Sequence, residues 1–389
     1  MLLLDVIWWW LLVRIAPRRW GRTVLSVFMA AQIFSFIWLI GGRLLHLSWD
    51  RALPKFAVIA MFIWHFLGLG LLSLLGIALM PVLLVWKIVS KARRSRVHIP
   101  KPASDPPVHY SRRDIIGLTV AMAPPLFTLS LTGVALSQLN HFRVRRLVLP
   151  IANLPIALDH LTITQVSDMH VGRFTSGSVL QGMVSTVNNL RSDLVVLTGD
   201  LINDSLSDLS EGLDLVRAMD PRLGLYLIEG NHDLIDNGEE FERRVKDSGI
   251  AFLLDETATV VVRGAPVQLL GLSWTRTRGE KRDQAISQSV CELLRLRATD
   301  AFPILLAHHP HAFDAAAEAG LPLTLSGHTH GGQLMLNEQT GFGPAMFRYW
   351  SGLYQRAESK LIVSNGVGNW FPLRINAPAE IIHITLHRA

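Results

Sequence analysis

Long apolar runs without charged side chains occupy the first third of the chain. Residues 23–42, 56–86 and 115–136 contain no Asp, Glu, Lys or Arg. A helix needs about 20 apolar residues to cross the roughly 30 Å hydrocarbon core of a bilayer. The pattern therefore predicts three transmembrane helices. A fourth run at residues 1–16 is shorter and contains Asp5, so the prediction is three or four spans.

The run at residues 56–86 is too long for one straight span. As a helix rising about 1.5 Å per residue it would extend roughly 46 Å. We therefore expect it to tilt, kink or emerge from the bilayer, with Pro81 as the place for a break. His65 within this run has two interpretations, a proton-relay residue or a polar contact between helices, and the second is favoured.

Basic residues gather in two loops between the apolar runs. The residues are Arg14, Arg18, Arg19 and Arg22 in one loop, and Lys87, Lys91, Arg93, Arg94, Arg96 and Lys101 in the other. Loops enriched in Lys and Arg face the cytoplasm. The run at residues 115–136 then leads outward, so the remainder of the chain is expected outside the cytoplasm. The linker at residues 97–107 holds four prolines and is predicted to be extended.

The sequence Ser111-Arg112-Arg113-Asp114-Ile115-Ile116 directly precedes the last apolar run. It resembles a twin-arginine export signal, although its position is internal and no Lys follows the apolar pair. That interpretation makes the twin-arginine export machinery a partner. The equally weighted alternative is that the two arginines are simply membrane anchors. Both alternatives give the same topology.

From residue 161 the pattern changes to short apolar runs alternating with helical stretches. The apolar runs are residues 161–166, 193–197, 224–228, 303–307 and 321–325, and the helical stretches include residues 179–190 and 206–219. Such alternation is typical of an α/β domain. In these domains the residues that bind ligands lie at the carboxyl ends of the strands.

A polar cluster follows each of these runs. The clusters are Ser167-Asp168-Met169-His170, Thr198-Gly199-Asp200, Glu229-Gly230-Asn231-His232-Asp233, His308-His309-Pro310 and Ser326-Gly327-His328-Thr329-His330. One such cluster is typical of a turn, but five in succession bring carboxylates and imidazoles to one rim of the sheet. Carboxylates gathered there need cations among them. Because Cys291 is the only cysteine, a thiolate zinc cluster is excluded.

The clusters resemble, in order and form, the motifs of the calcineurin-like metallophosphoesterases. Those motifs are Asp-x-His, Gly-Asp, Gly-Asn-His-Asp, an isolated His and Gly-His-x-His, and the resemblance covers about residues 160–389. The chain is most similar to the bacterial membrane-associated branch that contains the YkuE-like and YaeI-like phosphodiesterases. The similar segments are Gly327-His328-Thr329-His330-Gly331-Gly332-Gln333, Ser364-Asn365-Gly366-Val367-Gly368, Pro372-Leu373-Arg374 and Pro378-Ala379-Glu380-Ile381.

This resemblance implies a fold for each part of the chain. Residues 1–137 would hold the transmembrane α-helices, and residues 138–159 would form a juxtamembrane connection. Residues 160–389 would form an α/β metallophosphoesterase domain, in which two mixed β-sheets flanked by helices make an αββα sandwich.

The resemblance also implies a site that holds two divalent metal ions. The first ion would be held by Asp168, His170 and His330, the second by Asn231, His308 and His328, with Asp200 bridging them. His232 would be the general acid that protonates the leaving group. The nitrogen and oxygen donors suit Mn, Fe, Zn or Mg and do not choose among them.

Two features of this site stay open in the sequence. The related phosphoprotein phosphatases carry an Asp three residues after the bridging Asp, where it orients the catalytic His. Here that position holds Asn203, and Asp204 and Asp233 are the alternatives. The second open point is whether His308 or His309 is the ligand, with His308 favoured.

The charge distribution argues against nucleic acid as a partner. The formal net charge is +6, but residues 1–137 contain 15 Lys and Arg against 4 Asp and Glu, a net of +11. The remaining residues contain 22 against 27, a net of −5. A nucleic-acid-binding protein would carry its positive charge on the folded domain.

Together these features predict a multi-pass membrane protein whose catalytic domain hydrolyses a phosphodiester or pyrophosphate. The alternative is a non-catalytic membrane sensor or scaffold that keeps the fold. A membrane tether favours lipid-linked substrates and contact with membrane lipids. The resemblance points to the pyrophosphate of UDP-2,3-diacylglucosamine as one candidate substrate. That nucleotide-lipid is made on the cytoplasmic side, which conflicts with the predicted topology.

Overall fold

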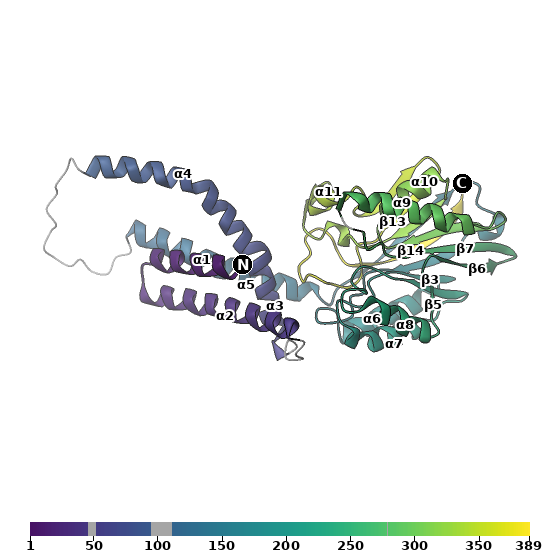
Figure 1. Ribbon diagram of the computed structural model, residues 1–389, viewed down its shortest axis with the longest axis horizontal. Helices are drawn as coiled ribbons and strands as arrows, with labels where there is room; N and C mark the ends of the chain where they lie inside the picture. Colours follow the sequence, from purple (N-terminus) through teal and green to yellow (C-terminus); the bar gives the residue numbers. More distant parts are fainter. Residues whose placement is uncertain (46–51, 95–110, 278) are drawn as a thin grey trace. The chain divides into compact units, whose positions relative to one another are not determined.

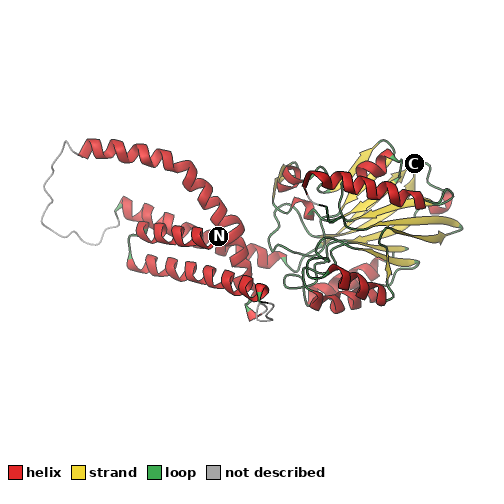
Figure 2. Ribbon diagram, viewed as in Figure 1, coloured by secondary structure: helices red, strands yellow, loops and turns green. Residues whose placement is uncertain are grey.

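The computed structural model describes residues 1–45, 52–94, 111–277 and 279–389 (Figure 1). These residues form two compact units, Met1–Leu136 and Ser137–Ala389. The first unit is helical and the second combines strands and helices (Figure 2). The linker predicted at residues 97–107 lies outside the described residues.

The helices of the first unit follow the apolar runs. They are α1 (Leu2–Ile15), α2 (Arg19–Leu44), α3 (Lys55–Ile63), a π-helical turn η2 (Trp64–Gly68), α4 (Leu69–Arg94) and α5 (Arg112–Gln138). Within the described residues, three segments are long and apolar enough to cross a membrane: Arg19–Gly42, Lys55–Val82 and Asp114–Gln138. Helix α1 has 14 residues, or about 21 Å, and is not among these three.

The helix does not end at Pro81. Helix α4 continues through Pro81, because one missing N–H in an apolar helix can be compensated locally. The irregularity lies instead at Trp64–Gly68, where the helix widens into a π-helical turn.

This turn presents two consecutive side chains to α1. Trp64 Nε1 donates to Asp5 Oδ1 at 2.8 Å, and His65 Nε2 lies 3.1 Å from Asp5 Oδ2. All three side chains are buried. The favoured interpretation of His65 as a polar contact between helices is confirmed.

The second unit is built on two six-stranded mixed sheets. The first has the order β1 (Arg143–Ile151), β14 (Glu380–Arg388), β2 (Thr162–Val166), β3 (Leu194–Thr198), β4 (Gly224–Ile228) and β5 (Ala251–Phe252). The second has the order β12 (Gly352–Arg356), β13 (Ser359–Val363), β9 (Leu323–Ser326), β8 (Phe302–Ala307), β7 (Ala265–Leu272) and β6 (Glu256–Val262). A separate hairpin pairs β10 (Met335–Asn337) with β11 (Thr340–Gly341).

The two sheets pack face to face with helices on both outer faces, as Figure 2 shows. One buried apolar cluster joins the sheets and includes Ile163 and Val196 from the first and Leu269 and Ile304 from the second. Helices α6 (Ser178–Leu190), α7 (Leu209–Arg217) and α8 (Gly238–Asp247) cover the first sheet, and α9 (Arg282–Leu293) and α10 (Ala312–Glu318) cover the second. The predicted αββα sandwich is confirmed.

Short helices complete this unit. They are η3 (Ile156–Leu158), η4 (Leu206–Asp208), η5 (Gly279–Lys281), η6 (Leu294–Leu296), η7 (His330–Gly332) and α11 (Phe342–Met346). Strands β2, β3 and β4 pair in parallel, as do β7, β8 and β9. Their carboxyl ends therefore meet along one rim of the sandwich, where the polar clusters follow.

Candidate metal centre

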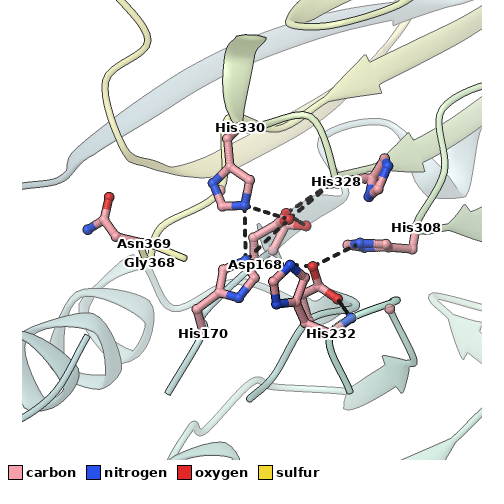
Figure 3. Close-up of polar contacts among 12 residues, drawn as sticks. Asp168, His170, His232, His308, His328, His330, Gly368 and Asn369 are labelled. Carbon is pink, nitrogen blue, oxygen red and sulfur yellow. Dashed lines mark hydrogen bonds and ion pairs between the residues drawn. The ribbon is translucent and has the colours of Figure 1, made fainter. Parts of the chain in front are cut away.

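The structure brings the predicted site residues together at this rim. Asp168 and His170 follow β2, Asp200 follows β3, Asn231 and His232 follow β4, His308 follows β8, and His328 and His330 follow β9. Figure 3 shows the Asp168 carboxylate surrounded by imidazoles that come from both sheets. The parallel register of each sheet therefore converts sequence-distant clusters into one centre.

Five of these residues adopt a left-handed backbone conformation. The φ angles are 54° at Asp168, 46° at His170, 56° at Asp200, 73° at His328 and 49° at His330. Positive φ is uncommon outside glycine, and it concentrates at functional sites, where the surrounding structure imposes it. Here it turns each side chain sharply inward as the strand ends.

Asp168, His170 and His330 form the first group of donors. Their ligand atoms all lie within 4.8 Å of one another and all three residues are buried. His170 Nε2 lies 2.9 Å from His330 Nε2, and Asp168 Oδ1 lies 3.3 Å from His330 Nε2. Two ring nitrogens at this separation need a proton or a cation between them, because two lone pairs would repel. This group fits the first predicted ion.

Asp200 lies between the two predicted groups of ligands. Its Oδ2 is 3.6 Å from His170 Nε2 and 3.2 Å from His308 Nε2. Asp168, Asp200 and His308 also place their ligand atoms within 4.8 Å of one another. This is the position that a bridging carboxylate requires.

The second group consists of Asn231, His308 and His328. His308 Nδ1 donates to the Thr198 carbonyl at 2.7 Å, which turns Nε2 towards Asp200. Asn231 Oδ1 and His308 Nε2 are buried and have no hydrogen-bond partner among the described residues. The His328 ring centre lies 5.1 Å from that of His308. Buried polar atoms without partners normally carry a cost, and a bound cation would remove it.

His309 lies behind this group. Its Nδ1 accepts from the His311 backbone N–H at 3.2 Å, and its ring packs 5.7 Å from Trp274 and 5.0 Å from His328. Of the two alternatives, His308 is the one whose ring nitrogen faces Asp200.

The carboxylates and imidazoles of the centre stabilise each other's charges. Burial alone raises the pKa of Asp200, but the charges of His308 and His232 outweigh it and hold the pKa well below its usual value. Burial alone lowers the pKa of His308, but the Asp200 carboxylate outweighs this and raises it to about 9. The Asp200 carboxylate and the His308 imidazole therefore stabilise each other's charged forms across the position predicted for a divalent cation.

His232 is held by two hydrogen bonds, one from its backbone and one from its ring. Its backbone N–H donates to Asp200 Oδ1 at 2.8 Å, and its Nδ1 lies 2.6 Å from the Asn203 carbonyl oxygen. Because a carbonyl only accepts, Nδ1 carries a proton and Nε2 is left for chemistry. The residue at position 203 thus orients His232, through its backbone carbonyl and not through its side chain.

Asp233 has a different role from orienting His232. Its carboxylate accepts from the backbone N–H groups of Asp200 at 2.9 Å, Gly230 at 2.8 Å and Ile202 at 3.0 Å. It thereby ties the loop after β3 to the loop after β4. Burial and the Asp200 charge raise the pKa of Asp233 well above its usual value.

The comparison with known families agrees with this geometry. The family model described as calcineurin-like phosphoesterase matches residues 161–332. Residues 161–332 carry a calcineurin-like phosphoesterase domain. The matched segment contains all the predicted ligands together with His232.

Similar curated proteins share the domain. A protein of Danio rerio named transmembrane protein with metallophosphoesterase domain is 33% identical over 62% of this chain and 56% of its own length. The Bacillus subtilis metallophosphoesterase YkuE is 28% identical over 60% of this chain and 81% of its own. Phosphodiesterase YaeI of Escherichia coli is 26% identical over 57% of this chain and 80% of its own. The alignment thus spans little more than half of the Danio rerio relative.

Arg374 supports the metallophosphoesterase centre from behind. It is buried, and its Nη2 donates to His330 Nδ1 at 2.8 Å and to the Gly368 carbonyl at 2.6 Å. Its Nε donates to Asn369 Oδ1 at 2.9 Å. Because a guanidinium only donates, His330 Nδ1 accepts, and Nε2 is the ring nitrogen that faces Asp168 and His170. The sequence placed Arg374 only within a tail motif, with no sign of this contact.

Two tryptophans border the centre, and sequence reasoning did not identify them. The Trp274 ring lies 5.5 Å from His308 and 5.0 Å from His328. The Trp370 ring lies 6.1 Å from His232 and 6.4 Å from His330. Nothing in the sequence around either residue distinguishes it from an ordinary core tryptophan.

Glu229 is a buried acid directly before the motif of Asn231. Its Oε1 accepts from the Trp274 backbone N–H at 2.8 Å. Burial outweighs this hydrogen bond and raises the pKa of Glu229 to about 7. This carboxyl therefore titrates near neutral pH.

Proposed function

We propose that the protein is a membrane-anchored, dinuclear metal-dependent phosphoesterase that hydrolyses a phosphodiester or pyrophosphate bond. The observation that carries the proposal is the position of Asp200 between two groups of buried nitrogen and oxygen donors. The name of the YaeI relative, a phosphodiesterase, supports the same class of reaction.

The donor set fits two divalent ions. Asp168, His170 and His330 would hold one, Asn231, His308 and His328 the other, and Asp200 would bind both. When bound, such ions lower the pKa of a water molecule between them and neutralise charge on the phosphate. The set suits Mn, Fe, Zn or Mg.

The chain itself supplies the proton and the positioning. His232 Nε2 faces away from the Asn203 carbonyl and delivers a proton to the leaving oxygen. Asp233 fixes the loops that carry Asp200 and Asn231 through its three backbone hydrogen bonds. Arg374 holds the His330 ring in place through Nδ1.

The apolar segments of the first unit are proposed to span the membrane. The Arg-rich loop before α2 and the Lys- and Arg-rich end of α4 support a topology in which both loops lie in the cytoplasm and the catalytic domain lies outside it. The Danio rerio relative is named a transmembrane protein. A domain tethered in this way favours lipid-linked phosphoesters as substrates.

Hydrolysis of a chromogenic phosphodiester by the full chain tests this proposal. Activity should require a divalent metal and disappear in Asp200→Asn, because the amide removes the charge between both groups of donors. Asp214→Asn is the control, because the Asp214 side chain is 76% exposed on α7. If the protein binds metal but hydrolyses no phosphoester in a broad panel, the alternative of a non-catalytic scaffold is favoured instead.

A further inference from the structure

Exposed apolar side chains gather on one part of the metallophosphoesterase domain. Leu336 is 80% exposed, Met346 67%, Phe342 52%, Ile375 39% and Trp370 36%. We call these five residues the apolar loop surface. Soluble domains rarely leave several large apolar side chains exposed together, so such a surface indicates a binding partner.

Hydrogen bonds hold the two segments of this surface together. Met335 N–H donates to the Ile375 carbonyl at 3.0 Å. Asn376 Nδ2 donates to the carbonyls of Met335 at 2.9 Å and Leu336 at 3.1 Å. Helix α11, which carries Phe342 and Met346, follows β11 directly and lies at the rim of the domain (Figure 1). The hairpin and the segment 370–376 therefore form one surface.

The chain enters the domain beside this surface. Gln138 is the last residue of α5 and of the apolar segment Asp114–Gln138. Its Oε1 accepts from the Arg374 backbone N–H at 3.1 Å, and Ile375 is the next residue. If α5 crosses the bilayer, the chain leaves the membrane next to the apolar loop surface. The partner within reach is therefore the bilayer itself.

A groove lies next to the apolar side chains. It has a volume of about 540 Å³, and Gln138, His141, Arg143, Arg374 and Asn376 are among its lining residues. Asn376 belongs to both the groove and the contact with Leu336. Arg143, whose side chain is 51% exposed and pairs with Glu380, brings a cation to this groove. A cation beside exposed apolar side chains favours contact with anionic lipid.

The tip of the β10–β11 hairpin limits how deeply the apolar loop surface can insert into the bilayer. Glu338 and Gln339 join β10 to β11. A carboxylate is costly to move into hydrocarbon. The tip therefore remains in the headgroup region, and the surface lies at the interface without spanning it.

The surface extends to the mouth of the metal centre. Trp370 belongs to the surface, and its ring lies 6.1 Å from His232 and 6.4 Å from His330. A substrate whose apolar part stays in the bilayer would thus reach His232 along Trp370.

We propose that the apolar loop surface rests on the bilayer that α5 crosses and presents the metal centre to phosphoesters of membrane lipids. The proposed docking to the bilayer rests on the apolar loop surface alone. The proposed class of substrate rests in addition on the proposed phosphoesterase function.

Fluorescence quenching in vesicles tests the docking. In the full chain, Cys291, which is the only cysteine and is exposed, is replaced by Ser. Leu336→Cys then carries an environment-sensitive dye, and Val261→Cys, at a 63% exposed position on β6, is the matched control. In phosphatidylcholine–phosphatidylglycerol vesicles, nitroxide-labelled lipids should quench the dye at position 336 and leave that at position 261 bright. Equal quenching at the two positions would overturn the proposed docking to the bilayer. A protein would then be the partner indicated for this surface.

Activity against two probes tests the substrate class. Leu336→Glu/Met346→Glu should lower hydrolysis of a diacylglycerol-linked chromogenic phosphodiester in vesicles about tenfold, because two apolar contacts with lipid are lost. Hydrolysis of water-soluble bis(p-nitrophenyl) phosphate should stay unchanged, as should both activities in Val261→Glu. If the wild type hydrolyses only the soluble probe, the lipid substrate is wrong and the proposed function stands. If it hydrolyses neither, the proposed function fails, and the quenching result still decides the docking.

Discussion

At the scale of single residues, substitution of His232 distinguishes proton delivery from metal binding. If His232 protonates the leaving group, His232→Ala should retain both metals and lose about 10²- to 10⁴-fold in activity. The loss should be large for alkyl esters, whose leaving groups need a proton, and small for nitrophenyl esters, whose leaving group departs as a stable anion. Rates on both ester classes, measured beside metal content, check this expectation.

Two further variants control this experiment. His328→Ala should lose metal and activity together on both classes of ester, because it removes a proposed ligand. His160→Ala should change neither, because its side chain is 70% exposed. Equal losses on good and poor leaving groups in His232→Ala would remove the general-acid role. Loss of metal in that variant would make His232 a ligand, since its ring also groups with His170 and Asp200.

Glu229 links stability to pH. Its pKa is raised by burial from 4.5 to about 7 in the folded protein, so the folded state binds this proton more tightly than the unfolded state. Stability from this group is present below pH 4.5 and is lost as the pH rises towards 7, by about 3 kcal/mol in total. Glu229→Gln should therefore lose less stability between pH 5 and pH 8 than the wild type.

Denaturant unfolding at several pH values measures this difference. Glu292→Gln is the control, because Glu292 is exposed on α9. Identical pH dependence in wild type and Glu229→Gln would show that Glu229 does not titrate in this range.

At the scale of elements, the centre depends on close contact between the loops after β3 and β4. A Cβ atom at Gly230 would overlap the Asp200 carboxylate and backbone nitrogen. Gly230→Ala should therefore displace Asp200 and lower metal binding and activity by at least tenfold, with the sandwich still folded. Elemental analysis, turnover and circular dichroism together check this.

Gly182→Ala is the matched control for this prediction. Gly182 lies in α6, and its added Cβ would make an ordinary contact with Phe142 at 3.9 Å. Alanine is the better helix former, so this variant should keep full activity with unchanged or higher stability. If Gly230→Ala behaved like it, the loop contact would not position Asp200.

At the scale of the whole molecule, the side of the membrane decides which substrates are available. The positive loops predict that a C-terminal alkaline phosphatase fusion is active and that a C-terminal green fluorescent protein fusion stays dark. Fusions made after Arg94 should give the opposite pattern. Fluorescence of the C-terminal fusion would place the domain in the cytoplasm and strengthen the case for a UDP-linked lipid.

The sequence alone was enough for the type of each element and for the donor chemistry. Apolar runs long enough to cross a bilayer predicted α2, α3–α4 and α5, and short buried runs predicted β2, β3, β4, β8 and β9. These are properties of neighbouring residues, so they can be read locally. The polar clusters resemble the motifs of the calcineurin-like metallophosphoesterases, and that resemblance pointed to the family. Because parallel strands bring their carboxyl ends together, the clusters were also expected at one rim.

The tertiary structure decided how those residues are held. The helix continues through Pro81 and widens into a π-helical turn at Trp64–Gly68. The backbone carbonyl of Asn203, and not its side chain, orients His232. Asp5 meets His65 across 60 residues, and Arg374 meets His330 across 44. The roles of the individual ligands stay predictions. Contacts of this kind leave no local pattern, because they arise only when distant segments pack and buried polar atoms find partners.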